Sequence, residues 1–501
     1  MIKYFISTFS ACILGFIFIC QAQESIPAVI PGDFADPSVI SDGKNYYAVG
    51  TSSEWAPHFP IYRSGDLQKW EPVGYVFDKA PEWTAGSFWA PEYYFMNGQY
   101  YIYYTARRKK DNISCMGVAV SKYPDHGFVD KGVIVDFGNE AIDAFIVEDK
   151  GQHYISFKAY GLDKRPIEIL AMKLSADGLR AEGEVFSLLK DDARVGLEGQ
   201  SFIKKDGYFY LFYSAGNCCG LKCDYNVQVA RSKAFKGPYE RFAQNPILFE
   251  NKDWTCSGHG TFVQDKKGRY QYLYHAYNKE STVYTGRQGQ LAELVWPEEN
   301  GWPVYKQQAP VKLKSSAASI YDSFDGKVPA LHWQWDWRHS SPVIQQSNNQ
   351  LRLSGAATSN NPTGIVLTVR PSKADFAIST KLSGQSSALR GLAYYGDAGA
   401  ALGLGLAGNQ LQIWVVRDQQ FTVLQSLPLQ SSNTVELKLS VDTNHLCQFY
   451  YKSGKDDWQK VSTNKPVFAN FLPQWDRSPR PGLHFRGNEM EYAIFTQFIL
   501  E

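Results

Sequence analysis

The chain has 501 residues and a formal net charge of +1. This length is too great for one ordinary hydrophobic core, so at least two domains are expected. The balanced charge gives no electrostatic reason to expect nucleic acid or an anionic membrane surface as a partner. Aromatic residues make up 15% of the chain, which suits a β-rich fold and the stacking of sugar rings on aromatic side chains.

The N-terminus has the pattern of a signal peptide. Lys3 is followed by the apolar run Ala11–Cys20, and small residues precede a cleavage point after Ala22. The pattern predicts a signal peptide over residues 1–22 and a secreted or periplasmic mature chain. An uncleaved anchor is the alternative, and the bulky Ile19 disfavours a lipid anchor on Cys20. No other segment is long and apolar enough to span a bilayer.

A repeat organises the next 290 or so residues. Five turn glycines, 53 to 61 residues apart, each precede a strand rich in Tyr and Phe; they are Gly43, Gly98, Gly151, Gly207 and Gly268. A further strand follows in every copy, and no long amphipathic helix interrupts the pattern. The spacing, with four strands expected in each of five repeats, predicts an all-β, five-bladed β-propeller over residues 23–311. A pair of β-sandwiches is the alternative.

The strand before each turn glycine is expected to line the central channel. Each of these strands carries a polar residue at its start: Asp36, Glu92, Asp143, Glu198 and His259. Equivalent positions of successive blades meet at one mouth of the channel, so several carboxylates are expected to gather there. Because like charges repel, a purely structural propeller has no reason to collect them.

Such a cluster suits glycoside hydrolysis, which needs two carboxyl groups in different protonation states. An inverting enzyme separates them by about 6.5–9.5 Å to leave room for the attacking water. A third carboxylate nearby raises the pKa of the acid by charge repulsion. The chemistry requires no organic cofactor.

Five ordered motifs carry a resemblance to a known family. They are Phe34-Ala35-Asp36-Pro37, Trp89-Ala90-Pro91-Glu92, Ile142-Asp143-Ala144-Phe145, Gly196-Leu197-Glu198-Gly199 and Gly258-His259-Gly260. Together, and in phase with the repeat, they resemble glycoside hydrolase family 43 over residues 28–310. The resemblance implies an inverting mechanism with Asp36 as general base, Glu198 as general acid and Asp143 as pKa modulator. Ala144 stands where the family usually has proline, which weakens the assignment of Asp143.

The same resemblance implies further contacts. Arg287 matches a family arginine that reaches the sugar in the first subsite, and Trp89 and Phe34 are expected substrate contacts. His259 matches a position near the channel axis that helps to hold a structural calcium, partly through water. This calcium is the one cofactor that the resemblance implies.

Cleavage after Ala22 leaves six cysteines. Cys218, Cys219 and Cys223 form the one cluster, and it lacks the second close pair or the histidines of a zinc site. One local disulfide is the expectation for an exported protein, although the sequence leaves its partners open.

The tail differs from the repeat. Residues 312–320 are expected to form a linker, and period-two alternation in segments such as Leu351–Leu353 and Val435–Leu439 predicts a β-sandwich over residues 321–501. It resembles the sandwich modules attached to family xylosidases and arabinofuranosidases.

These observations favour a secreted, monomeric enzyme acting on oligo- or polysaccharides. Removal of terminal α-L-arabinofuranosyl residues from plant polysaccharides is favoured over β-D-xylosidase activity. An endo-arabinanase and an exo-galactosidase of the same family are alternatives. A retaining sucrose- or fructan-cleaving propeller is disfavoured because Ala35, not Asn, precedes Asp36. A non-catalytic carbohydrate-binding propeller is the alternative of another class.

Overall fold

The computed structural model describes residues 24–138, 140–160, 166–297, 301–307, 311–312, 319–430, 434–454 and 456–501. The expected signal peptide and most of the expected linker lie outside these residues. Within the described ranges the elements are strands, apart from a single 3-10 turn, η1 (Thr282–Tyr284). No helix in this part of the chain is long and apolar enough to cross a membrane.

Five four-stranded sheets form the first unit, and their strands follow chain order. The first sheet holds β2 (Ser38–Ser41), β3 (Tyr46–Val49), β5 (His58–Ser64) and β6 (Glu71–Phe77). The second holds β7 (Thr84–Met96), β8 (Gln99–Arg108), β9 (Ser114–Ser121) and β10 (Val129–Val135). The third holds β11 (Glu140–Asp149), β12 (Gln152–Tyr160), β13 (Glu168–Leu174) and β14 (Ala181–Lys190).

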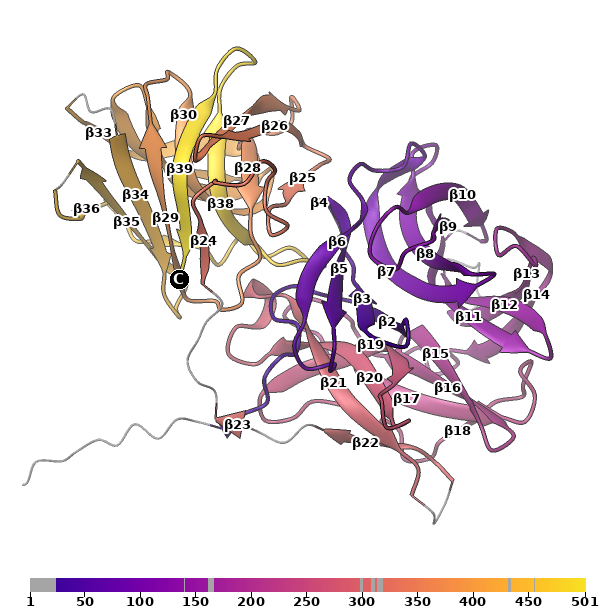
Figure 1. Ribbon diagram of the computed structural model, residues 1–501. Helices are drawn as coiled ribbons and strands as arrows, with labels where there is room; N and C mark the ends of the chain where they lie inside the picture. Colours follow the sequence, from indigo (N-terminus) through magenta and orange to yellow (C-terminus); the bar gives the residue numbers. More distant parts are fainter. Residues whose placement is uncertain are drawn as a thin grey trace, which may run out of the picture.

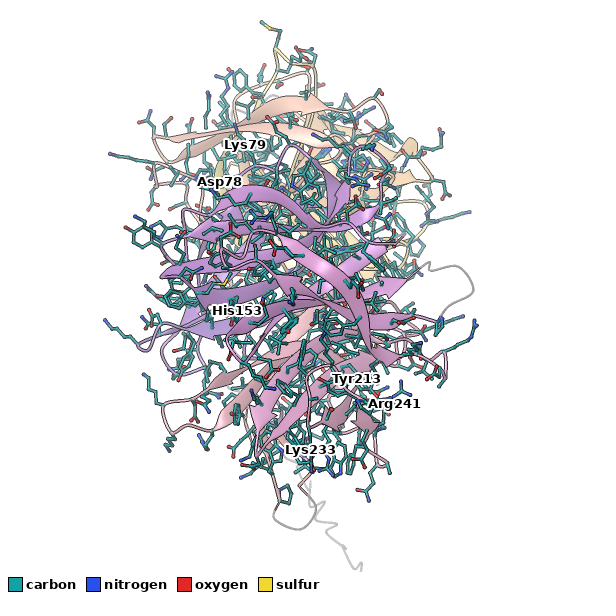
Figure 2. All side chains as sticks on the ribbon, turned by 90° about the vertical axis from the view of Figure 1, so that its right-hand side faces the viewer. Asp78, Lys79, His153, Tyr213, Lys233 and Arg241 are labelled. Carbon is teal, nitrogen blue, oxygen red and sulfur yellow. A yellow bond between two sulfur atoms is a disulfide. The ribbon has the colours of Figure 1, made fainter. Side chains whose placement is uncertain are left out.

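The fourth sheet holds β15 (Glu198–Lys205), β16 (Tyr208–Ala215), β17 (Asn226–Ser232) and β18 (Glu240–Arg241). The fifth holds β19 (Trp254–Gln264), β20 (Tyr270–Asn278), β21 (Arg287–Val295) and β22 (Val304–Gln307). In Figure 2, the labelled Asp78, His153 and Lys233, from the first, third and fourth repeats, follow one another down the view. The expected five-bladed propeller is confirmed.

The turn glycines and the tyrosines account for this repeat. Gly43, for example, has φ +88° between β2 and β3, in the left-handed region that favours glycine. The following strands bury their aromatic side chains between neighbouring blades. Tyr103 of the second sheet and Phe157 of the third are both fully buried in one such cluster. The aromatic residues of these strands therefore hold neighbouring blades together by hydrophobic packing.

The beginning of the chain joins the first blade to the last. The amide of Phe34 donates to the carbonyl of Arg287 (2.7 Å), and Ile30 and Gly289 form a bridge beside β21. Further out, β1 (Glu24–Ser25) pairs with β23 (Val311–Lys312). This closure places the residues after Phe34 directly beside Arg287.

The second unit is a sandwich of two antiparallel sheets. The larger sheet contains β24 (Ile320–Asp322), β26 (Ser340–Ser347), β27 (Gln350–Ala357), β29 (Phe376–Ser383), β34 (Thr434–Val441), β35 (Leu446–Ser453), β36 (Gln459–Val461), β37 (Val467–Phe468) and β39 (Ala493–Leu500). The smaller sheet contains β28 (Ile365–Thr368), β30 (Leu389–Asp397), β31 (Ala400–Ala407), β32 (Gln410–Arg417), β33 (Gln420–Pro428) and β38 (Arg480–Arg486). Strict alternation along β34 buries one face in the shared core.

The two units pack side by side (Figure 1). Strand β4 (Trp55–Ala56) of the propeller pairs with β25 (Trp335–Asp336) of the tail. The guanidinium of Arg480 lies 4.2 Å from the centre of the Trp55 ring. Trp337 packs on His58 of the propeller, with ring centres 5.3 Å apart. The junction is thus built from paired backbone and buried aromatic rings.

Two disulfides occur among the described residues, where one was expected. Cys218 bonds to its neighbour Cys219, and Cys223 bonds to Cys256 of β19. Cys115 and Cys447 are free and buried. The second bridge could not be anticipated because Cys256 is 33 residues from its partner.

Candidate active site

One backbone position recurs at the mouth of every blade. The residues at this position have positive φ angles between 41° and 61°; they are Asp36, Ala90, Asp143, Gly199 and His259. In the second to fifth sheets the ladder is interrupted there by a bulge. A bulge breaks the alternation of side chains and re-aims them, and positive φ is costly for residues other than glycine. The fold therefore holds these positions in a shape that turns their side chains toward the channel mouth.

Glu92 does not share this position. It lies two residues after Ala90, and its carboxyl group hydrogen-bonds Ser38 of the first sheet. Burial raises its pKa to about 8. The sequence pattern grouped Glu92 with the other carboxylates, whereas the structure places it two residues beyond the shared position, which Ala90 occupies in this blade, and past a bulge that shifts the register by one residue.

Asp36 is surrounded by hydrogen-bond donors. Thr51 Oγ1 donates to its Oδ2 (2.7 Å), and Arg287 Nη1 donates to its Oδ1 (3.2 Å). His259 Nδ1 lies 3.4 Å from the same Oδ1. Burial would raise the pKa of Asp36, but the Arg287 guanidinium and the His259 imidazole hold it well below its usual value. Asp36 is therefore ionised across the physiological range.

Asp143 lies in a different environment. Its Oδ2 accepts a hydrogen bond from the amide of Gly199 (3.0 Å), and its own amide donates to Thr105 Oγ1 (3.2 Å). Burial raises the pKa of Asp143 to about 6; His259 opposes this rise and the nearby Glu198 carboxylate adds to it.

Glu198 precedes the left-handed Gly199 at the start of β15. Its Oε2 contacts Lys158 Nζ, and its Oε1 accepts a hydrogen bond from the Tyr225 hydroxyl (2.9 Å). Burial would raise the pKa of Glu198, but the Lys158 ammonium lowers it below its usual value.

His259 lies between these carboxylates. A Cβ atom at Gly199 would come within 2.7 Å of the His259 ring, so position 199 needs glycine for space as well as for its φ of +57°. The described part of the chain holds no group of three His, Cys, Asp or Glu side chains able to bind a metal, so an ion beside His259 would need water or carbonyl oxygens for much of its coordination.

The expected substrate contacts divide into two kinds. Trp89 is partly exposed, and Arg287 reaches the Asp36 carboxylate. Phe34 is fully buried: its ring packs edge-on against Tyr62, with ring centres 5.1 Å apart. Phe34 is therefore a core residue beneath the site, and its prediction as a substrate contact is wrong.

A residue of the sandwich also reaches the site. Asp476, in the loop before β38, accepts a hydrogen bond at Oδ2 from Trp89 Nε1 (3.1 Å). Its main-chain carbonyl accepts from Arg287 Nη2 (2.9 Å). The side chain of Asp476 is nearly buried, so this loop forms one wall of the site.

Sequence reasoning missed several residues around these carboxylates: Thr51, Lys158, Tyr225, His275 and Asp476. His275 accepts a hydrogen bond at Nδ1 from the amide of Asp36 (3.0 Å), and burial lowers its pKa to about 4. Lys158 and His275 lie in the second strands of their blades, β12 and β20. The aromatic residues of these strands indicated packing between blades and no role in the site. A polar residue within such an apolar strand was the available signal.

Comparison with known proteins identifies the class. Residues 27–303, more than half of the chain, match the family described as "Glycosyl hydrolases family 43". Residues 321–470 match the "Beta xylosidase C-terminal Concanavalin A-like domain". The chain belongs to glycoside hydrolase family 43 and is an inverting glycoside hydrolase.

Individual relatives agree with this membership. The chain is 30% identical over 314 residues to an extracellular exo-α-(1→5)-L-arabinofuranosidase, ArbA, of Cellvibrio japonicus, covering 54% of this chain and 86% of that protein. It is 27% identical over 219 residues to an extracellular endo-α-(1→5)-L-arabinanase of Bacillus subtilis, covering 41% of this chain and 66% of that one. A xylan β-1,4-xylosidase from Bacillus halodurans superposes with a TM-score of 0.80 at 20% identity, over 94% of this chain and 99% of that chain.

Proposed function

We propose that this protein is a secreted, exo-acting α-L-arabinofuranosidase that removes terminal arabinofuranosyl residues from plant polysaccharides. In this proposal Asp36 is the general base and Glu198 the general acid, and Asp143 modulates the pKa of Glu198. Asp36 takes a proton from the attacking water as that water adds to the anomeric carbon. Glu198 gives a proton to the departing oxygen, and the configuration inverts.

The environments of Asp36 and Asp143 support these roles. Asp36 is ionised because Arg287 and His259 surround it, as a base must be. Asp143 and Glu198 lie close together and influence each other's ionisation, so that one proton held between them can serve the acid step.

The Asp476 loop carries the exo-acting part of the proposal. Its contacts with Trp89 and Arg287 place a wall of sandwich residues against one side of the site. An endo-acting enzyme needs a groove open at both ends, whereas an exo-acting enzyme needs a closed end. The likeness to an exo-acting arabinofuranosidase of Cellvibrio japonicus supports the same mode and sugar.

A β-D-xylosidase is the second candidate, because the sandwich matches a domain described from β-xylosidases. Hydrolysis rates on 4-nitrophenyl α-L-arabinofuranoside and β-D-xyloside decide between the two. We expect the arabinofuranoside to be cleaved at least tenfold faster. Arabinan digested to arabinose alone supports exo action, whereas early release of longer oligosaccharides contradicts it.

Secretion is part of the proposal. The apolar N-terminal run supports it, as do two disulfides, which persist in oxidising compartments. Expression with the native N-terminus, followed by N-terminal sequencing of the exported chain, tests it. We expect the mature chain to begin at Gln23, and a chain retained in the cytoplasm contradicts the proposal.

Calcium is proposed as an ion that His259 helps to hold, partly through water, since no group of three His, Cys, Asp or Glu side chains in the described residues is placed to bind a metal. Melting temperatures before and after chelation, and after calcium is restored, test this proposal. A melting temperature that chelation leaves unchanged contradicts the presence of a structural calcium.

A further inference from the structure

We propose that Lys158 is a positioning residue for the general acid: it holds Oε2 of Glu198 in the free site and gives up this oxygen to the leaving group when substrate binds. The proposal deepens the function proposed above, because it depends on Glu198 being the acid.

Both oxygens of Glu198 are engaged by donors. Lys158, from β12 of the third blade, contacts Oε2, and Tyr225 donates to Oε1. An ammonium group can only donate hydrogen bonds. A carboxyl oxygen cannot accept a hydrogen bond through the lone pair that already carries its proton. The arrangement therefore suits an ionised Glu198, and a proton on the Oε2 lone pair that faces Lys158 requires Lys158 to move away.

In this proposal the leaving group approaches the same oxygen, Oε2. The side chains of Lys158 and Glu198 are 11% and 16% exposed, so both reach the edge of the site without being open to solvent. A glycosidic oxygen that comes within hydrogen-bond distance of Oε2 must replace the Lys158 ammonium there. When this acceptor takes the place of the Lys158 donor, the proton that Asp143 and Glu198 hold between them can occupy Oε2 and pass to the departing oxygen.

Lys158 has acidic neighbours to which it can turn. Asp143 of β11 and Glu140, at the start of the same strand, both raise the pKa of Lys158 against the opposing effect of burial. Glu140 also lies 3.5 Å from Arg107 of the second blade. The ammonium therefore remains charged and compensated after it leaves Glu198.

Other groups facing Glu198 bear on its ionisation. They are the Tyr225 hydroxyl from the loop before β17, the His259 imidazole of β19 and the Asp143 carboxyl of β11. Tyr225 and His259 favour the ionised form of Glu198, as Lys158 does, whereas Asp143 disfavours it. Removing Lys158 alone thus has a defined sign: the pKa of Glu198 rises, and the acid stays protonated to higher pH.

The test is the pH dependence of kcat/KM for Lys158→Met on arabinobiose, whose sugar leaving group needs the acid. We expect the alkaline limb to move upward by about 1 to 3 pH units, the usual effect of one nearby opposite charge. Lys158→Arg keeps the charge and should keep the limb near its original place. Lys158→Gln provides a second neutral variant if the methionine variant does not fold.

A matched control comes from the same pair of blades. Lys204 of β15 pairs with Asp149 of β11 at 3.2 Å, but its side chain is 53% exposed. Lys204→Met should leave the limb in place. If folded Lys158→Met and Lys158→Gln keep the original alkaline limb, Lys158 does not act through Glu198 and the proposal is overturned.

The dependence on the proposed function is tested separately. Glu198→Ala should lose more activity on arabinobiose than on a 4-nitrophenyl glycoside, whose leaving group needs little protonation. Without that difference, Glu198 is not the acid, and the proposed function fails first. With that difference but no shift in the Lys158 variants, the inference about Lys158 alone fails.

Discussion

Asp36 and Asp143 occupy the same backbone position in the first and third blades, yet their chemistry differs. Both have positive φ and are less than 10% exposed, so burial raises both pKa values. At Asp36, Arg287 and His259 reverse this effect. At Asp143, His259 opposes it and the Glu198 carboxylate reinforces it, and the pKa stays raised. The repeat thus supplies the position, and the neighbours from other blades decide the protonation state.

The largest expected effect comes from removing the ionised member of the pair. Asp36→Asn keeps the shape but cannot take a proton from water, so kcat should fall by about 10² to 10⁴-fold. Every substrate needs this step, so the loss should be similar for arabinobiose and for 4-nitrophenyl glycosides. Asp149→Asn, on the surface of the third blade, is the control, and a loss confined to poor leaving groups would contradict the role of Asp36.

The second effect concerns the carboxyl that Asp143 influences. Glu198→Ala should lower kcat on natural glycans by about 10² to 10⁴-fold. It should spare much of the activity on aryl glycosides with acidic phenols, because those groups leave without a proton. Steady-state kinetics on both substrates checks this expectation. If Asp36→Asn rather than Glu198→Ala shows this dependence, the two roles must be exchanged.

A third experiment makes Asp36 resemble Asp143. Arg287→Met removes the main cation beside Asp36, so the pKa of Asp36 should rise by about 1 to 3 units. The base is then protonated at a higher pH, and the acidic limb of kcat/KM moves upward. Arg287→Lys retains charge and should show a smaller shift. An acidic limb that stays fixed in a folded Arg287→Met variant contradicts the account of Asp36.

The fourth experiment removes the charge of Asp143. Asp143→Asn lets Glu198 ionise at lower pH, so the alkaline limb of kcat/KM should move downward.

The stability of the Asp143→Asn variant supplies an independent measure. The folded-state pKa of about 6 lies above the ordinary 3.8, so ionisation of Asp143 destabilises the fold as the pH rises through 6. The variant should therefore gain up to about 3 kcal/mol in the free energy of unfolding between pH 4 and pH 8, relative to the parent enzyme. Urea unfolding at both pH values measures this, and equal pH dependence of the two proteins contradicts it.

The smallest effect is expected at the sandwich wall. Asp476→Ala removes the acceptor of Trp89 but leaves the main-chain contact with Arg287, and so the environment of Asp36, in place. We expect KM to rise about tenfold, with the limbs of the pH profile unchanged, as for the loss of a charge-assisted hydrogen bond of about 1.5 kcal/mol. Kinetics on the short substrate arabinobiose measures this effect. A shifted acidic limb would mean that Asp476 acts on Asp36 as well.

The repeat was enough to predict the propeller and to bring Asp36, Asp143 and His259 to one mouth. Spacing along the chain could not reveal bulges, and so Glu92 was placed with them, although Ala90 holds the equivalent position and Glu92 lies two residues beyond it. Phe34 was mistaken for a substrate contact because a motif reports proximity along the chain but not burial. Lys158 and Asp476 were missed because their partners, Glu198 and Trp89, lie 40 and 387 residues away along the chain. Only folding brings each pair into contact.

The wall contributed by Asp476 has an evolutionary consequence. The propeller supplies the proposed acid and base, but the residue that meets Trp89 and Arg287 comes from the sandwich. Strands β4 and β25 pair the two domains through their backbones. Recombination that exchanged the sandwich for that of a relative would therefore exchange part of the substrate pocket. Selection on this loop can change the accepted glycan while every proton-transferring group stays the same, so the two domains are expected to be inherited together.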